Sequence, residues 1–102
     1  PTNIQGWTPQ KVWDDINKPW IEAAVSRGDV LRAVSDPLNI NNVFNNTANI
    51  PSSAFSSPQS LSDFLKNLPP TQIDQLSYYG REIRHLSQNN YLFELSSNLF
   101  LK

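Results

Sequence analysis

The residues best suited to acid–base chemistry are concentrated in one short stretch, GREIRHL. It contains Arg81, Glu82, Arg84 and the only histidine of the chain, His85. A histidine or glutamate can exchange a proton in a reaction, and arginines hold phosphate groups through paired N–H donors. At 3.6 residues per turn, Arg81, Arg84 and His85 share one face of a helix and Glu82 lies at its edge. This face is either the solvent side of an ordinary amphipathic helix or the wall of an active site.

A second concentration of charge follows Gly28 in the sequence RGDVLRAVSDP. Its apolar and β-branched residues predict a strand over residues 29–35, which carries Arg32 and ends at Asp36. The charges can pair with one another as surface salt bridges. Alternatively, the cluster can be a site at a strand end, where Asp36 or Ser35 is presented by the turn that Pro37 makes rigid.

A third candidate is Lys18, which lies where Pro19 must break the first helix. The preceding Asp14 and Asp15 are adjacent, so their side chains point in different directions and make a poor metal pair. We expect solvated carboxylates there, with Lys18 as a substrate-binding residue.

Several familiar reaction types are excluded by the motifs that the chain lacks. It has no cysteine, no His-x-x-x-His pair, no glycine-rich phosphate loop and no Gly-x-Ser-x-Gly sequence. We therefore expect no metal and no cofactor. RNA cleavage by attack of the internal 2′-hydroxyl group suits such a chain, because it requires only a base, an acid and cationic support for the phosphorane.

Composition predicts one domain over residues 1–102 with an aromatic core. The chain has 38% hydrophobic residues, among them three Trp, five Phe and three Tyr, which is enough to drive folding. Eight basic and nine acidic residues give a net charge of −1, which argues against nucleic-acid binding through a bulk positive field and leaves only a local patch. No apolar run approaches the ~18 residues of a membrane span, so we expect no stable membrane association.

Local signals predict two helices at the start of the chain, over residues 9–17 and 19–27. Thr8 is a suitable N-cap, and Gly28 is suited to the left-handed conformation that ends a helix. An apolar stripe at spacings of three and four runs through Trp13, Ile16, Trp20, Ala23 and Ala24.

The middle of the chain is rich in Asn, Ser and Pro. Residues 39–60 predict a long loop that is either a lid or mobile, with a possible short strand over residues 42–44. Its apolar side chains Leu38, Val43, Phe44, Ile50 and Phe55 are expected to hold it against the core.

The second half predicts two more helices and two strands. A short helix begins near Ser60, and a longer one over residues 72–88 begins at Thr71 and Asp74 and ends at Asn89-Asn90. The tail predicts two strands joined by a turn at Ser96, Ser97 and Asn98, with Tyr91, Phe93 and Leu95 on one face. The fold class is α+β, with N-terminal helices and a small, mainly antiparallel sheet that includes a C-terminal hairpin.

The combination of INKPWIEAAVSRGDVLRAVSDP with YGREIRHL and a following aromatic strand resembles the C-terminal toxin domains of bacterial polymorphic toxins. These domains are carried on filamentous-haemagglutinin-type and contact-dependent growth inhibition proteins. The family pattern is a helix with N-K-P, a strand R-G-D-x-[IL]-R that ends in S-D-P, and a late helix with G-[RK]-E-I. The matching positions are Asn17, Lys18, Pro19, Arg27, Gly28, Asp29, Arg32, Ser35, Asp36, Pro37, Gly80, Arg81, Glu82 and Ile83.

The resemblance implies a toxin that is part of a larger secreted or cell-surface carrier, which fits a sequence that begins at Pro1 without an initiator methionine. Such a toxin acts in the target-cell cytoplasm, often as a nuclease on tRNA or other RNA. A cognate immunity protein neutralises it, so we expect a monomeric toxin in a heterodimer. By position, the resemblance carries over Lys18, Arg32, Asp36, Arg81 and Glu82 as site residues, whereas His85 follows the motif and is a candidate on chemistry alone.

Two other functions remain open. Trp13, Trp20 and the aromatic tail can form the surface of a non-enzymatic interaction module. A compact arginine site on a near-neutral chain also suits a toxin that acts on a nucleotide or on NAD.

In the ribonuclease interpretation the catalytic residues are Glu82, His85, Arg32 and Asp36, and Lys18, Arg81 and Arg84 bind substrate.

Overall fold

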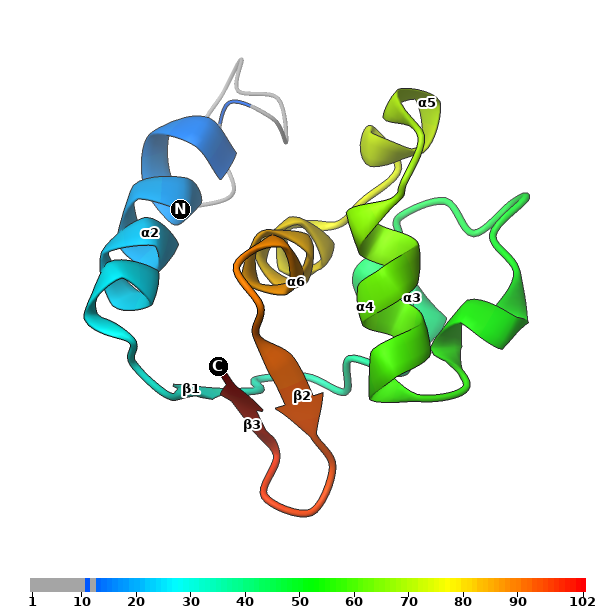
Figure 1. Ribbon diagram of the computed structural model, residues 1–102. Coiled ribbons are helices and arrows are strands. Elements are labelled where there is room, and N and C mark those ends of the chain that lie inside the picture. The colour runs from blue at the N-terminus through cyan, green and yellow to red at the C-terminus, as the bar shows by residue number, and fades with distance from the viewer. Residues whose placement is uncertain (1–10, 12) are drawn as a thin grey trace.

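The computed structural model describes residue 11 and residues 13–102 of the chain. Helices and a small sheet alternate along this part (Figure 1). The elements are the π-helix η1 (Trp13–Asn17), α2 (Lys18–Arg27), β1 (Leu31–Arg32), α3 (Ile40–Val43), the 3-10 helix η2 (Ser52–Phe55), α4 (Pro58–Lys66), α5 (Pro70–Ile73), α6 (Tyr78–Gln88), β2 (Leu92–Glu94) and β3 (Leu99–Leu101). The predicted α+β class is confirmed.

The first helical region changes its hydrogen-bonding pattern near the predicted break. The π-helix η1 passes into α2 at Lys18, and Pro19 occupies one of the first positions of α2, where no intrahelical N–H donor is needed. Gly28 ends α2 in the left-handed conformation, with φ 71°, and its N–H donates to the carbonyl of Val25. The end at Gly28 is confirmed, and the predicted N-cap at Thr8 lies outside the described residues.

The sheet has three strands in the order β1-β3-β2, all antiparallel. Phe100 of β3 is the central position, because it pairs with Leu31 of β1 on one side and Phe93 of β2 on the other. The hairpin of β2 and β3, with its turn at residues 95–98, confirms the predicted tail. Leu95, however, is exposed, because β2 ends at Glu94 and the alternation of faces ends with it.

The prediction of a strand over residues 29–35 is wrong in extent, because β1 has only two residues. It pairs only with the three-residue β3, so few ladder partners are available. Ala33 is buried, but Val30 is exposed and Val34 has 81% of its surface exposed. Both valines lie outside the two-residue strand, so their β-branched, apolar side chains do not contribute to the core.

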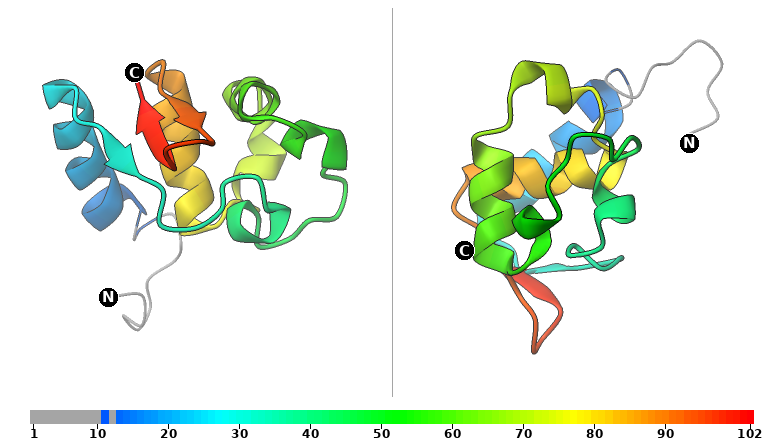
Figure 2. Two further views of the ribbon diagram at one scale, coloured as in Figure 1. Left: turned by 90° about the horizontal axis from the view of Figure 1, so that it is seen from below. Right: turned by 90° about the vertical axis from the view of Figure 1, so that its right-hand side faces the viewer.

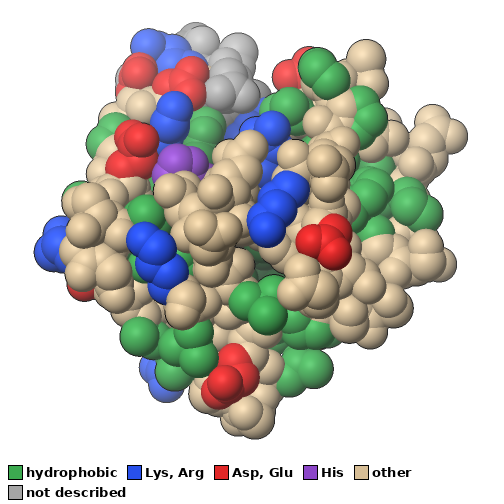
Figure 3. Space-filling view, in the orientation of Figure 1, with side chains coloured by type: hydrophobic (Ala, Val, Ile, Leu, Met, Phe, Trp, Pro, Cys, Tyr) green, Lys and Arg blue, Asp and Glu red, His purple; other side chains and the backbone are tan. Residues whose placement is uncertain are grey.

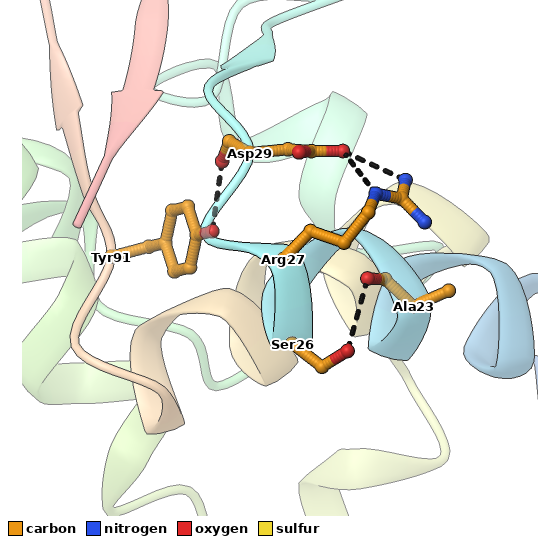
Figure 4. A network of polar contacts seen from close by, with 5 residues as sticks. All are labelled: Ala23, Ser26, Arg27, Asp29 and Tyr91. Atoms are coloured by element: carbon orange, nitrogen blue, oxygen red, sulfur yellow. Dashed lines mark hydrogen bonds and ion pairs between the residues drawn. The ribbon is translucent and has the colours of Figure 1, made fainter.

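The connection from α2 into β1 is fixed from across the domain (Figure 4). The hydroxyl of Tyr91 donates to the carbonyl of Asp29 at 2.8 Å. The carboxylate of Asp29 also forms an ion pair with Arg27 at 2.7 Å, and the two side chains are 40% and 62% exposed, respectively. This confirms the salt-bridge reading for that pair of charges, and such an exposed pair contributes little to stability.

The segment over residues 39–60 is more ordered than the predicted loop. It contains α3, capped by the Asn39 side chain, and η2, and Phe44 makes one isolated bridge to Leu76 in place of the predicted short strand. Val43, Phe44 and Ile50 are buried in the core, as expected.

The two later helix starts differ from the prediction. α4 begins after Ser57, whose Oγ accepts from the Ser60 N–H at 3.1 Å. The predicted helix over residues 72–88 is two helices, because the chain turns after α5 and restarts at Ser77, whose Oγ accepts from the Gly80 N–H at 2.9 Å. Its end at Asn89 and Asn90 is confirmed.

Helix α6 occupies the middle of the domain. In Figures 1 and 2, η1 and α2 lie on one side of α6, and α3 and α4 lie on the other. The core is aromatic as predicted, with Trp13, Phe44, Tyr91, Phe93 and Phe100 buried. Trp20, which the sequence pattern placed on the same stripe as Trp13, has 64% of its surface exposed.

We predict that Gly80→Ala destabilises the protein, although alanine is normally the better helix former. A Cβ atom at Gly80 would collide with the backbone carbonyl oxygen of Val43 at the end of α3. Because this oxygen belongs to the backbone and not to a flexible side chain, it cannot easily move aside. We expect the free energy of unfolding to fall by about 2–3 kcal/mol, measured by urea denaturation. Gln88→Ala in the same helix should change it by less than about 0.5 kcal/mol, and an equally stable Gly80→Ala protein would contradict the close packing.

Candidate functional site

A small polar cavity of about 110 Å³ lies between η1, the start of α2 and one side of α6. We call it the basic cavity. Its lining residues are Trp13, Lys18, Ile73, Arg81, Arg84, His85 and Gln88. Figure 3 shows the histidine on the face turned to the viewer, with Lys and Arg side chains near it. No acidic side chain is among the lining residues, so the cavity suits an anion.

The basic cavity brings together four of the seven site residues predicted from the sequence. Arg81, Arg84 and His85 share one side of α6, and Lys18 reaches the same cavity from the first residue of α2. Helical spacing accounts for the first three, whereas the approach of Lys18 depends on the packing of α2 and η1 against α6.

Arg81 lines the basic cavity but is buried, so it does not belong to a solvent-exposed face of α6. Only 4% of its surface is exposed, and its guanidinium donates to the carbonyls of Leu76 at 2.5 Å and Ile73 at 3.3 Å. Burial lowers the pKa of Arg81. Its Nε is buried and has no hydrogen-bond partner within the described residues. Arg81 therefore ties α5 to α6 and retains one unused donor.

The charged groups of Arg84 and Lys18 differ in their contacts with the rest of the domain. The Nε of Arg84 donates to the carbonyl of Leu65 at the end of α4, at 3.2 Å, which fixes the side chain while its terminal nitrogens stay available. The ammonium of Lys18 has no hydrogen bond or ion pair to another described residue. Both groups can accept an anion without breaking an existing ion pair.

His85 is the residue of the basic cavity whose side-chain type can exchange a proton near neutral pH. Burial lowers the pKa of His85 from 6.5; Glu22 opposes this shift, and Lys18 and Arg84 add to it. The ring packs edge-on against Trp13, with the centroids 5.9 Å apart. The imidazole is therefore mainly neutral at pH 7 and able to accept a proton.

Glu82 and Arg32 do not reach the basic cavity. They line a second cavity of about 260 Å³ on another side of α6, which we call the apolar cavity. Its lining residues are Trp20, Ile21, Leu31, Arg32, Val34, Tyr79, Glu82, Ile83, Leu86 and Phe100. Burial raises the pKa of Glu82, and it raises the pKa of Tyr79 to about 12.

Asp36, the last of the predicted site residues, lines neither cavity. Its carboxylate accepts from the backbone N–H of Leu38 at 2.9 Å, which closes the turn around Pro37. This contact gives Asp36 a local structural role in the loop after β1.

Sequence reasoning missed the aromatic parts of both cavities. Trp13 and Trp20 were read as one apolar stripe, yet Trp13 lies against His85 and Trp20 lines the apolar cavity. Tyr79 packs against the core and also lines the apolar cavity, and its hydroxyl donates to the carbonyl of Ser35 at 2.7 Å. No local pattern separates these positions, because each depends on which neighbouring element packs there.

Comparisons with protein-family models, with curated proteins and with solved structures found no match to this chain. Among the described residues, no three His, Cys, Asp or Glu side chains are grouped as metal ligands would be. The described helices also include none with the length and hydrophobicity of a membrane span.

We predict that Arg81→Ala lowers the free energy of unfolding by about 2–3 kcal/mol, because the carbonyls of Leu76 and Ile73 each lose a charged guanidinium donor. Chemical denaturation measures the change. Arg27→Ala is the matched control: it removes the same charge from an exposed ion pair and should cost less than about 1 kcal/mol. Equal effects of the two substitutions would contradict a structural role for Arg81.

We predict that His85 titrates below pH 6.5 in an NMR experiment on its ring protons. The pKa of His85 is lower in the folded protein than in the unfolded chain, where it is about 6.5. At pH values between these two pKa values, the unfolded chain therefore binds more protons than the folded protein. The contribution of neutral His85 to the free energy of unfolding is therefore fully present above pH 6.5 and is lost as the pH falls below it. The comparison with His85→Gln isolates this contribution, and a stability difference independent of pH between 7 and 5 would contradict the prediction.

Proposed function

We propose that this chain is a toxin domain that acts inside a target bacterium as a metal-independent ribonuclease. The observation that carries the proposal is the basic cavity, where a mainly neutral histidine lies together with the cationic residues Lys18, Arg81 and Arg84. A base and several cations around a space of this size suit one phosphodiester group.

In the reaction, His85 takes the proton from a ribose 2′-hydroxyl group and the 2′ oxygen attacks the adjacent phosphorus. The bond from phosphorus to the 5′ oxygen breaks, and that oxygen is protonated by the imidazolium or by water. The products are a 2′,3′-cyclic phosphate and a free 5′-hydroxyl group. Lys18 and Arg84 stabilise the negative charge on the phosphorane, and no redox step or cofactor is required.

This arrangement supports a local anion site on a chain whose net charge is −1. The basic cavity supplies positive potential where the phosphate must lie, so a basic surface over the whole domain is not required. The proposal assigns the proton transfer to His85. Glu82 and Arg32 line the other cavity and take no part in this proton transfer.

The resemblance to polymorphic toxin domains supports the biological setting of the proposal. A larger carrier delivers the domain into the target-cell cytoplasm, and a cognate immunity protein forms a heterodimer with it in the producing cell. An inhibitor that covers the basic cavity would block access of the phosphodiester.

A second candidate function is a protein-interaction module. The exposed side chains of Trp20 and Val34 favour it, since exposed apolar residues of this size are common anchors of protein interfaces. A purified domain that binds an immunity protein but leaves RNA intact would favour this function over the first.

The direct test is to incubate the purified domain with total bacterial RNA, with and without EDTA, and to separate the products on a denaturing gel. We expect discrete fragments in both conditions. His85→Ala should lower the cleavage rate by about 10²-fold or more, and Lys18→Ala and Arg84→Gln by about tenfold or more each. The fragments should carry 2′,3′-cyclic phosphate ends.

Lys66→Ala is the matched control, because Lys66 is an exposed cation of α4 that does not line the basic cavity. It should cleave at the rate of the unaltered protein. Cleavage that persists in His85→Ala, or that disappears with EDTA, would contradict the proposed mechanism.

A further inference from the structure

The apolar cavity is the larger of the two cavities, and the ribonuclease mechanism does not use it. Its walls come from α2, β1, α6 and β3, so they belong to the framework of the domain. Eight of its ten lining side chains are apolar or aromatic without a charge, as is typical of sites for small organic groups.

Two charged side chains interrupt this apolar lining. Glu82 is half-buried on α6, and its carboxylate has no hydrogen bond or ion pair to any described residue, so burial alone governs its titration. Arg32 on β1 is exposed and its guanidinium is likewise without a partner in the described part of the chain. The two groups line one cavity without forming an ion pair with each other.

A desolvated carboxylate without a partner is costly unless a ligand supplies donors. An ionised carboxylate offers only acceptors, and a guanidinium offers only donors. The matching ligand therefore presents two N–H donors on one edge and acceptors on a neighbouring edge, within a flat apolar body. Guanine has this pattern, with N1–H and the N2 amino group on one edge and O6 and N7 on the next.

The aromatic wall agrees with a flat ligand. Trp20 lines the cavity and has 64% of its surface exposed, which leaves indole surface available for stacking. Stacking on an aromatic side chain is a common source of affinity for nucleobases. Tyr79, whose hydroxyl is already bonded to the carbonyl of Ser35, adds a second aromatic ring to the lining.

We propose that the apolar cavity is a binding site for a guanine base, held by Glu82 at N1–H and the N2 amino group, by Arg32 at O6 and N7, and by stacking on Trp20. The site does not depend on the ribonuclease function, because it lies on a different side of α6 from the basic cavity. The base can belong to a guanosine in single-stranded RNA or to a free guanine nucleotide, since both present the same edges.

The test is an NMR titration of the ¹⁵N-labelled protein with guanosine, inosine and adenosine, which carry no phosphate. We expect guanosine to bind about tenfold or more tightly than adenosine, with inosine between them because it lacks the N2 amino group. The indole N–H of Trp20 and the amides around Glu82 should shift. Equal affinity for guanosine and adenosine, or shifts confined to the basic cavity, would overturn the proposal.

Glu82→Gln should weaken guanosine binding by about tenfold, because an amide replaces one acceptor with a donor. Glu94→Gln makes the same change on the exposed hairpin and should leave the affinity unchanged. Thermal melts of both variants establish that they are folded. Guanosine binding that survives in folded Glu82→Gln would overturn the assignment of Glu82.

Two further ligands distinguish whether the guanine base that the cavity binds belongs to RNA or to a free nucleotide. A single-stranded RNA pentamer with one central guanosine among uridines is compared with guanosine 5′-monophosphate. Tenfold tighter binding of the pentamer supports the site and assigns it to RNA, whereas equal or tighter binding of the nucleotide supports the site and assigns it to a free nucleotide. Because none of these titrations requires cleavage, a failure of the ribonuclease proposal remains distinguishable from a failure of this one.

Discussion

The close contact between the first turn of α6 and the end of α3 is the constraint on which the rest of the structure depends. Gly80 lies directly against the carbonyl of Val43, so that the backbones meet without an intervening side chain. Ser77 joins the same two segments: its N–H donates to the Val43 carbonyl at 2.9 Å, and its Oγ donates to the Asn42 carbonyl at 2.6 Å while capping α6. This contact fixes where α6 begins, and with it the direction of every side chain on the helix.

Once α6 is fixed, the burial of Arg81 follows. Its guanidinium donates to the carbonyls of Leu76 and Ile73 where α5 ends and the chain turns, which compensates in part for taking a charge out of water. The helix then presents Arg84 and His85 to one cavity, and Glu82 to the other. The separation of the acid from the histidine is therefore a consequence of helix geometry together with the packing of α2 on α6.

The two cavities differ in the physical means by which they can hold a ligand. The basic cavity concentrates cations in a small polar space, so its affinity for an anion should weaken as salt screens the charges. The apolar cavity combines hydrophobic burial with one acceptor group and one donor group, so its selectivity depends on the hydrogen-bonding edges of the ligand. A near-neutral chain can therefore carry two distinct binding environments in one small domain.

The sequence by itself determined the features that depend on neighbouring residues: the end of α2 at Gly28, the end of α6 at Asn89 and Asn90, the C-terminal hairpin and the α+β class. Helical spacing also placed Arg84 and His85 on one side of α6. Only the tertiary structure decided that Arg81 is buried, that Trp20 is exposed and that Glu82 and Arg32 share the apolar cavity. The physical reason is that spacing fixes which residues share a face, whereas burial depends on the element that packs against that face.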